Sequence, residues 1–344
     1  MKPAVTRIMA TVAADRCPDL RAALTALRDA GADGFRINSA HASVKSMAGF
    51  IAACRAVDPS LLILMDTKGP EMRTTVTPAP LLLAPGDMTD IVSSPSPDAE
   101  PTVAGRIGVA VSDLHRYVAT GEQILFDDGL IAAEITDVRP DGMLRARIVR
   151  GGELGSRKTV ALSSGIVPPL PAVSRRDAEF IRAAAAEGID IIAHSFVRSA
   201  DDLRAVRSLI GDAPISLYAK IECRDALANL DAIIAEADGL LVARGDLGTA
   251  LPLSDIPSVQ FEVMRRCRAA GKPAIISTQI MQSMIDSPVP TRAEVSDVAL
   301  AVMEGADMLL LCGETAQGRY PCECVAMMRR TILSTEAAGL RNIL

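Results

Sequence analysis

Tryptophan is absent from this chain of 344 residues, and aromatic residues make up only 3% of it. Ala, Leu, Ile, Val and Met must therefore fill the core, and few rings are left for a surface that stacks nucleic-acid bases. An excess of positive charge is also lacking, because the formal net charge is −6. We therefore predict no nucleic-acid partner, and an anionic substrate would need local positive charge or a metal ion.

Long apolar runs are lacking as well. The run MLLL at 308–311 is far too short to cross a bilayer, and the N-terminal segment has no uninterrupted apolar stretch like that of a signal peptide. The seven cysteines have no regular spacing, and Cys322 and Cys324 lack a second pair at zinc-site spacing. These absences predict a cytoplasmic protein with free thiols, no membrane association and no structural zinc.

Short β-rich runs alternate with helical stretches along most of the chain. Leu20, Leu24 and Leu27 follow the spacing of an amphipathic helix, and Gly31 and Gly271 each follow a helical stretch as a C-cap does. The strand-like runs are 6–12, 34–38, 61–67, 190–196, 216–222, 239–244, 273–279 and 307–314. Their number favours an α/β fold with a closed (β/α)8 TIM barrel over an open doubly wound sheet, and no G-x-G-x-x-G follows a strand.

The alternation breaks between the third and the fourth strand. Residues 74 to about 160 are rich in Pro, Gly, Asp and β-branched residues, which indicates short strands and turns without clear helices. We predict that residues 74–159 form a small β domain, inserted after strand three at the C-terminal rim of the barrel. The barrel itself would comprise residues 1–73 and 160–344, and the inserted domain would act as a lid.

Charged and polar residues stand where six of the eight predicted strands end. They are Arg36 and Asn38, the segment from Asp66 to Arg73, Lys220 and Glu222, Arg244 and Asp246, Thr278 and Gln279, and Glu314. The carboxyl ends of barrel strands build the active site, and so many charges on one rim would be costly without an ion or an anionic ligand. Carboxylates suit a hard divalent cation, and Arg and Lys suit phosphate or carboxylate groups. The pattern indicates metal-dependent phosphoryl transfer.

Segments along nearly the whole chain resemble those of the pyruvate kinase family. The matching segments are RINSAH (36–41), MDTKGPEMRT (65–74), GGELGSRK (151–158), SFVRSADDL (195–203), AKIE (219–222), DGLLVARGDLG (238–248), TQIMQSMI (278–285), PTRAEVSDVA (290–299) and GADMLLLCGETAQGRYP (305–321). The resemblance implies a barrel with an inserted β lid. It also implies a glycolytic, ATP-binding phosphotransferase that converts phosphoenolpyruvate and ADP into pyruvate and ATP.

The resemblance also implies a role for individual residues. Glu222 and Asp246 would hold Mg²⁺ or Mn²⁺, Lys220 would stabilise the transferring phosphoryl group, and Arg36 and Arg73 would bind phosphates. The other implied residues are Thr278 and Glu314 for protonation of the enolate; Ser195, Phe196, Gly245, Asp246 and Thr278 for the substrate; Arg36, Asn38, His41 and Lys158 for the nucleotide; and Asn38, Asp66 and Thr67 for K⁺.

The motif Arg244-Gly245-Asp246 joins a cation, a glycine and a carboxylate at one strand end. We expect the glycine to permit close approach, Asp246 to bind the metal and Arg244 to brace the turn against that aspartate. The backbone N–H groups of Gly245 and Asp246 would face the substrate carboxylate at the start of a helix.

The chain departs from the family pattern at four places. Ala40 replaces a serine that holds K⁺ in the family, so the K⁺ site is expected to be weakened although Glu71, which accompanies K⁺ dependence, is present. The loop VAAD (12–15) replaces a Gly-Pro near the nucleotide, and Cys312 and Gln317 replace a serine and a lysine. The chain also ends soon after the last barrel helix, so we expect the C-terminal regulatory domain to be absent.

Two other functions stay open at this point. The altered VAAD loop and Ala40 are compatible with a paralogue that uses the same metal and enolate chemistry on another acceptor, or that makes and breaks C–C bonds beside an enolpyruvate. A non-catalytic binding or regulatory protein is the third hypothesis. By family resemblance, a dimer formed across the barrel helices is expected.

Overall fold

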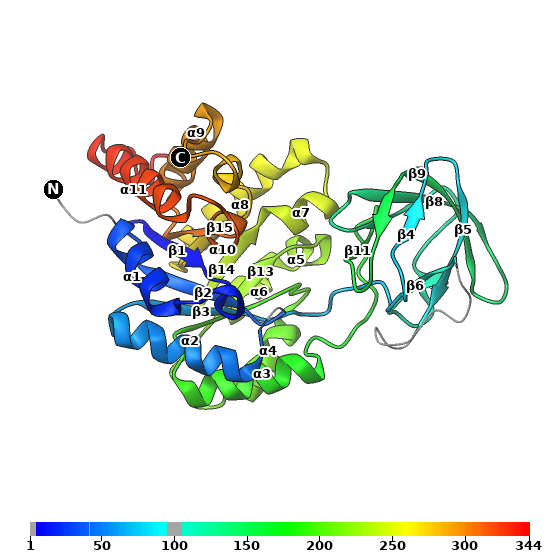
Figure 1. The fold of residues 1–344 in the computed structure, drawn as a ribbon, viewed down its shortest axis with the longest axis horizontal. Coiled ribbons are helices and arrows are strands. Elements are labelled where there is room, and N and C mark those ends of the chain that lie inside the picture. The colour runs from blue at the N-terminus through cyan, green and yellow to red at the C-terminus, as the bar shows by residue number, and fades with distance from the viewer. Residues whose placement is uncertain (1–4, 41, 95–104) are drawn as a thin grey trace.

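Eight parallel strands close into a barrel in the computed structural model, which describes residues 5–40, 42–94 and 105–344. Around the barrel the strands follow the order β1-β16-β15-β14-β13-β12-β3-β2 (Figure 1). Their bounds are β1 (Arg7–Thr11), β2 (Gly34–Asn38), β3 (Leu62–Asp66), β12 (Ile191–His194), β13 (Ser216–Ile221), β14 (Gly239–Ala243), β15 (Ala274–Ser277) and β16 (Met308–Leu311). The predicted (β/α)8 barrel is confirmed, and the open sheet is not formed.

Helices connect the strands and cover the outside of the barrel (Figure 1). They are α1 (Leu20–Ala30), α2 (Val44–Val57), α3 (Arg175–Glu187), α4 (Ala200–Ile210), α5 (Arg224–Ala228), α6 (Leu230–Glu236), α7 (Arg244–Ala250), α8 (Ile256–Ala269), α9 (Arg292–Met303), α10 (Gly313–Ala316) and α11 (Pro321–Ala337). Short 3-10 turns are η1 (Ala14–Arg16), η2 (Leu114–Arg116), η3 (Leu253–Asp255) and η4 (Gln282–Ile285). The predicted C-cap of α1 is confirmed, because Gly31 has a φ of 117°.

Alternation along each strand separates the barrel interior from the layer between strands and helices. Met9, Leu64 and Leu241 fill the interior, whereas Ile8 and Phe35 pack outward against helices. Since side chains alternate, the interior rows end at the C-terminal mouth in polar residues. These residues are Thr11, Arg36, Asn38, Asp66, Ser195, Lys220, Glu222, Ser277 and Cys312.

A separate β domain follows β3 and returns to the barrel before α3. Its strands are β4 (Leu81–Leu83), β5 (Met88–Ser93), β6 (Ile107–Val109), β7 (Gln123–Phe126), β8 (Ile131–Val138), β9 (Leu144–Arg150), β10 (Gly152–Leu154) and β11 (Val160–Leu162). They form a six-stranded sheet and a two-stranded sheet around a core of their own, which includes Ile91, Phe126 and Ile135. The predicted insertion of a β domain after strand three is confirmed, and it lies beside the barrel, away from both termini (Figure 1).

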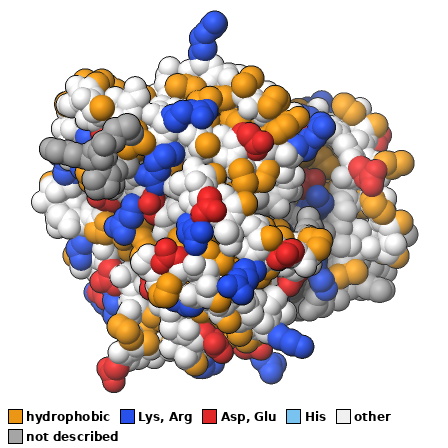
Figure 2. Space-filling view, turned by 60° about the vertical axis from the view of Figure 1, so that its left-hand side comes forward, with side chains coloured by type: hydrophobic (Ala, Val, Ile, Leu, Met, Phe, Trp, Pro, Cys, Tyr) orange, Lys and Arg blue, Asp and Glu red, His pale blue; other side chains and the backbone are white. Residues whose placement is uncertain are grey.

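Charges of both signs mix on the protein surface. Figure 2 shows Lys and Arg side chains interspersed with Asp and Glu over one face, with scattered apolar side chains between them. Within the part of the chain that the structure describes, no helix combines the length and the apolar character that a membrane span needs.

Candidate active site

A polar pocket of about 450 Å³ lies between the barrel mouth and the inserted domain. Most of the residues that the sequence predicts for the site line this pocket together. They are Arg36, Asn38, Asp66, Thr67, Arg73, Lys158, Ser195, Phe196, Lys220, Glu222 and Asp246. Gly245, Thr278 and Glu314 are not among the lining residues, and His41 lies outside the described residues.

Lys220 is the central cation of the pocket, at the interior end of β13. Its Nζ lies 2.8 Å from Glu222 Oε1 and 3.5 Å from Asp66 Oδ2. The same ammonium donates to Ser195 Oγ at 2.8 Å. Burial alone would lower the pKa of Lys220, but the charges of Asp66, Glu222 and Asp246 together raise it. The lysine is therefore a permanent positive charge rather than a proton donor at neutral pH.

The buried carboxyl group of Glu222 and the half-buried one of Asp246 form a pair beside Lys220. Burial and, less strongly, the neighbouring Asp246 raise the pKa of Glu222 to about 8, against the effect of Lys220. Burial also raises the pKa of Asp246, whose carboxyl group is hydrogen-bonded to Glu222. Glu222 Oε2 in turn accepts the backbone N–H of Phe196 at 2.7 Å. Two adjacent carboxylates that resist ionisation suit a divalent cation, which would neutralise them both.

The pair supplies only part of a metal coordination shell. Among the described residues, no group of three or more His, Cys, Asp or Glu side chains has a geometry that would hold a metal ion. Mg²⁺ is commonly held by one or two carboxylates and completed by water and substrate oxygens. The donor set therefore fits a Mg²⁺ or Mn²⁺ ion that binds together with a substrate.

Asp66 stands at the end of β3, where it pairs with Arg36. Arg36 also donates to Thr11 Oγ1 at 3.2 Å. Asp66 Oδ1 is buried and has no hydrogen-bond partner among the described residues. The Asn38 side-chain oxygen accepts the backbone N–H of Ala40 at 3.0 Å. Asp66 Oδ1 is therefore available to a cation, whereas Ala40 has no side-chain oxygen to offer.

Two pocket cations near the junction of the barrel and the inserted domain are held in ion pairs. Arg73 lies 2.6 Å from Glu71 Oε2 and donates to the Arg157 carbonyl at 2.8 Å. Lys158 contacts Asp127 at 2.9 Å. Both cations lie where the chain crosses between the barrel and the inserted domain, because Arg73 forms an antiparallel bridge with Thr159.

Arg244 does not brace its own turn against Asp246, so that expectation was wrong. Its guanidinium pairs with Asp297 on α9 through two contacts of 2.7 Å and donates to the Thr278 carbonyl at 3.0 and 3.1 Å. Thr278 and Gln279 both have left-handed backbone angles, with φ of 73° and 54°. Arg244 therefore holds a strained strand end, because a β-branched residue at positive φ persists only when its surroundings fix it.

Gly245 packs closely against the side chain of Thr278. A Cβ at this position would lie 2.7 Å from Thr278 Cγ2. Glu314 is fully buried and accepts the backbone N–H groups of Met281 and Cys312 at 3.2 and 2.8 Å. It therefore fixes the backbone beneath the mouth rather than lining the pocket itself.

A family description, "Pyruvate kinase, barrel domain", matches residues 4–325. The chain belongs to the pyruvate kinase family. It is 35% identical to a pyruvate kinase of Borreliella burgdorferi over 94% of this chain and 67% of that protein. It is 39% identical to a pyruvate kinase of Sporosarcina psychrophila and 38% identical to one of Staphylococcus aureus, over 97% and 91% of this chain.

The match to these pyruvate kinases does not extend over their whole length. The chain spans 57% of the Sporosarcina protein and 54% of the Staphylococcus protein. The shared part is the barrel with its inserted domain, which holds the pocket described above.

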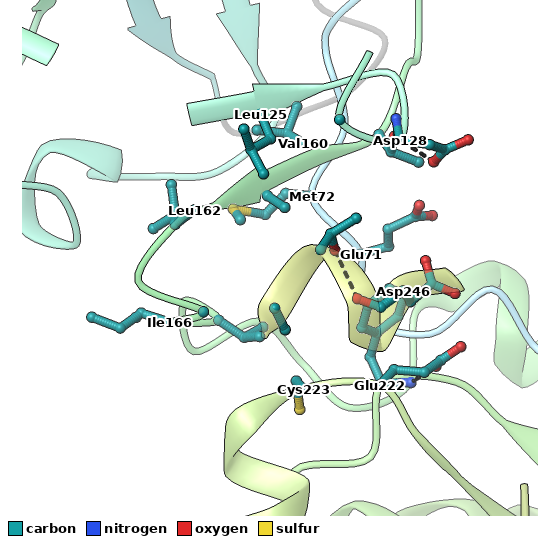
Figure 3. Close-up of a pocket in the computed structure, with 18 of the residues that line it drawn as sticks. Glu71, Met72, Leu125, Asp128, Val160, Leu162, Ile166, Glu222, Cys223 and Asp246 are labelled. Atoms are coloured by element: carbon teal, nitrogen blue, oxygen red, sulfur yellow. Dashed lines mark hydrogen bonds between the residues drawn. The ribbon is translucent and has the colours of Figure 1, made fainter. Parts of the chain in front are cut away.

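A smaller apolar pocket of about 60 Å³ adjoins the carboxylates of this pyruvate kinase family member (Figure 3). Met72, Leu125 and Leu162 lie on one side of it, and Glu222 and Asp246 lie on the other. On this side an apolar wall replaces water around the carboxyl groups, which contributes to their raised pKa values. Sequence patterns did not indicate this pocket, because residues from well-separated parts of the chain, such as Met72, Leu125 and Leu162, form its apolar wall together.

Sequence reasoning also missed two residues that support the site. Asp297 pairs with Arg244, and His194 hydrogen-bonds Thr67 Oγ1 through Nδ1 at 2.9 Å. Asp297 lies inside the family-like segment 290–299, so its presence there was a usable signal. No sequence signal marked His194. Side chains alternate along a strand, and this alternation places His194 on the outer face of β12, among core residues.

Proposed function

We propose that this chain transfers the phosphoryl group of phosphoenolpyruvate to ADP and releases pyruvate and ATP. The observation that carries the proposal is the position of Lys220, whose ammonium lies between Ser195 and Glu222 in a pocket that Asp246 also lines. In this reaction the P–O bond to the enol oxygen breaks, a P–O bond to ADP forms, and the enolate takes up a proton on carbon.

Different residues of the pocket would bind the metal ion, stabilise the transferring phosphoryl group and bind the phosphates. Glu222 and Asp246 would hold Mg²⁺ or Mn²⁺, which when bound supplies positive charge to substrate carboxylate and phosphate oxygens. Lys220 would stabilise negative charge on the phosphoryl group during transfer, because its raised pKa keeps it protonated. Arg36 and Arg73 would bind phosphate oxygens.

The other proposed contacts follow from the family resemblance. Ser195 and Phe196 would contact the substrate, with Gly245 and Asp246 facing its carboxylate through their N–H groups. Lys158 would contact the nucleotide from the inserted domain. Asn38, Asp66 and Thr67 would hold K⁺, Asn38 and His41 would also face the nucleotide, and Thr278 would lie on the proton path to the enolate.

A coupled assay tests the proposed activity. We expect pyruvate formation from phosphoenolpyruvate that needs both ADP and Mg²⁺, with a smaller stimulation by K⁺ than a complete K⁺ site would give. Lys220→Met is expected to lower kcat by about 100-fold or more, since the charge acts in the transition state. The exposed Lys45→Met on α2 is the matched control and should leave kcat unchanged. Turnover that needs another acceptor instead of ADP would support the paralogue, and metal binding without any turnover would contradict the proposal.

We also propose a dimer and a cytoplasmic location. Apolar side chains are exposed on successive elements, with Leu253 76%, Val289 62% and Phe261 39% exposed. All seven cysteines are free thiols, which suits a reducing compartment. Light scattering of the purified chain should give twice the monomer mass, and a monomer at micromolar concentration would contradict the dimer.

A further inference from the structure

A chain of hydrogen bonds leads from Lys220 out of the pocket into the protein. The ammonium of Lys220 donates to Ser195 Oγ at 2.8 Å, and this hydroxyl donates to the Thr67 backbone carbonyl at 2.7 Å. The backbone N–H of Ser195 in turn donates to Thr67 Oγ1 at 3.0 Å. Thr67 therefore holds Ser195 at two points, and Ser195 presents its lone pairs to Lys220.

His194 closes this chain from the helix side of the barrel wall. Its ring is fully buried, and its Nδ1 lies 2.9 Å from Thr67 Oγ1. The Thr67 hydroxyl already accepts the N–H of Ser195. A hydroxyl has one proton to donate, so an unprotonated Nδ1 would be the acceptor for that proton.

The contacts of Thr67 point to this tautomer. Among the described residues, Nδ1 is the acceptor within reach of the Thr67 hydroxyl proton, since the other contact of that hydroxyl is the N–H of Ser195. Nε2 is buried and has no hydrogen-bond partner among the described residues, so the far side of the ring does not fix the tautomer. A proton on Nε2 leaves the lone pair of Nδ1 facing the Thr67 hydroxyl.

We propose that His194 is a positioning residue for the phosphoryl-transfer site, acting through Thr67 and Ser195 on Lys220. This inference rests on the function proposed above. An acceptor at Nδ1 fixes the direction of the Thr67 hydroxyl, which then accepts only from Ser195. Ser195 and the Lys220 ammonium are held in one arrangement as a result. Loss of the acceptor would leave the hydroxyl free to turn and would let Ser195 and Lys220 shift.

Three variants separate positioning from simple filling of the core. Asn keeps an acceptor near the place of Nδ1, Gln reaches the place of Nε2, and Leu keeps most of the volume without any acceptor. We expect His194→Leu to lower kcat by about 10- to 100-fold, as loss of a supporting hydrogen bond at an active site commonly does. Its KM for phosphoenolpyruvate should change by less than about threefold, because Lys220 acts mainly in the transition state. His194→Asn should restore kcat, and His194→Gln should not.

The outcome depends on comparing kcat with folding stability. Thr67→Val should lower kcat as His194→Leu does, and the double variant should be no worse than either one, because both remove the same link. If Asn, Gln and Leu lower stability to the same extent and kcat follows stability, His194 only fills the core and the proposal is overturned. Unchanged kcat in His194→Leu overturns it as well.

A second measurement does not depend on activity. The chain has three histidines, so ¹⁵N spectra of the unmodified protein, with His194→Asn for assignment, give the tautomer of each ring. We expect His194 to carry its proton on Nε2 and to show an unprotonated Nδ1. A proton on Nδ1 would overturn the proposal even if the enzyme turns over as proposed. If the tautomer is as expected but neither the unmodified chain nor any variant turns over, the proposed function fails instead.

Discussion

At Lys220 the negative charges outnumber the positive ones. Asp66, Glu222 and Asp246 all act on the ammonium, and Arg36 is the other cation paired within this group. Three carboxylates against two cations leave an excess of one negative charge when all are ionised. Since burial and Asp246 raise the pKa of Glu222 to about 8, the group retains a proton at neutral pH unless a cation replaces it. A divalent ion would reverse the sign of the site and suit an anionic substrate.

Glu222→Gln tests whether this excess of negative charge binds a divalent ion. The amide keeps the shape of the side chain but removes one ligand and the repulsion with Asp246. We expect Mn²⁺ affinity, measured by electron paramagnetic resonance, to fall by about 10- to 100-fold. The free energy of unfolding without metal should rise or stay unchanged above about pH 8, where Glu222 would otherwise ionise beside Asp246. The exposed Glu153→Gln on β10 serves as the control and should leave both quantities unchanged. Unaltered Mn²⁺ binding in Glu222→Gln would contradict the assigned ligand.

His194 makes a separate contribution to the pH dependence of stability. Its pKa is lowered from 6.5 to about 4 by burial, so between these values the unfolded chain binds a proton that the folded chain does not. The stability that the neutral ring contributes is therefore present above about pH 6.5 and is lost as the pH falls toward 4. From about pH 7.5 to about pH 5, the loss should be about 2 kcal/mol.

The measurement is urea unfolding across this pH range in the unmodified chain and in His194→Asn. Other groups titrate in both proteins, so the difference between the two curves isolates His194. Between about pH 7.5 and pH 5, we expect the free energy of unfolding of His194→Asn to fall by about 2 kcal/mol less than that of the unmodified chain. Parallel curves would show that the ring is not held neutral in the folded chain.

For individual residues, the sequence indicated which charged side chains would lie together, but not which other residues would hold them in place. Lys220 and Glu222 share a strand face, and parallel strands end together, so their meeting with Asp66 and Asp246 was predictable. The link from His194 to Thr67 joins residues 127 positions apart and lies on the opposite side of the barrel wall. No local pattern encodes such a contact.

At the scale of elements, the end of β15 is the most constrained part of the mouth. Thr278 and Gln279 leave the strand at positive φ, and Arg244 fixes the Thr278 carbonyl from the first residue of α7. The side chain of Thr278 packs where Gly245 has no Cβ. The start of α7 and the end of β15 are therefore one unit, and a change in either should move the other.

Gly245→Ala tests whether these two elements act together. The added Cβ would lie 2.7 Å from Thr278 Cγ2, so Thr278 must move. We expect kcat to fall by about 10- to 100-fold, because small misplacements at a reacting centre cost this much. In Gly248→Ala, on the same helix, the Cβ meets only Leu253 Cδ2 at 3.2 Å, on a side chain that is 76% exposed. This control should keep its kcat and gain up to about 1 kcal/mol of stability from helix propensity. Equal kcat values in the two variants would contradict the coupling.

The same strand ends explain where the predicted element boundaries differ from the structure. The predicted run 190–196 becomes β12 (Ile191–His194), and 307–314 becomes β16 (Met308–Leu311) followed by α10. Apolar residues continue past the last ladder hydrogen bond because the mouth is buried as well. Phe196, for example, has a φ of 53°, which no strand residue adopts. Composition indicates burial, whereas the backbone turn depends on tertiary contacts.

At the scale of the whole molecule, two hydrophobic cores are joined by two chain crossings. The inserted domain packs around Ile91, Phe126 and Ile135, and none of these residues belongs to the core of the barrel. The crossings pair with each other, since Thr74 donates to the Lys158 carbonyl at 2.8 Å. The existence of a second domain was predictable from its turn-rich composition. Its side pocket was not, because that pocket forms only where the domain meets the barrel.

We propose residues 74–159 as the inserted segment, to which β11 (Val160–Leu162) adds the last strand of the six-stranded sheet, and replacing 74–159 with about two or three glycines tests this. Arg73 bridges Thr159 in the structure, so the cut ends are adjacent and a short linker closes them. We expect the variant to unfold cooperatively, because the barrel retains its own core. It should bind Mn²⁺ but lack ADP-dependent turnover, since Lys158 is removed.

The deletion should also change the carboxylates that it does not touch. Met72, Val160 and Leu162 would lose their neighbours in the side pocket, and water would reach Glu222 and Asp246. With less burial, the pKa of Glu222 should fall from about 8 toward 4.5, so Mn²⁺ binding should depend less on pH between these values. Titrations of Mn²⁺ at several pH values in the two proteins measure this. An unchanged pH dependence would show that the barrel alone sets the carboxylate environment, and a variant that aggregates would place the domain limits elsewhere.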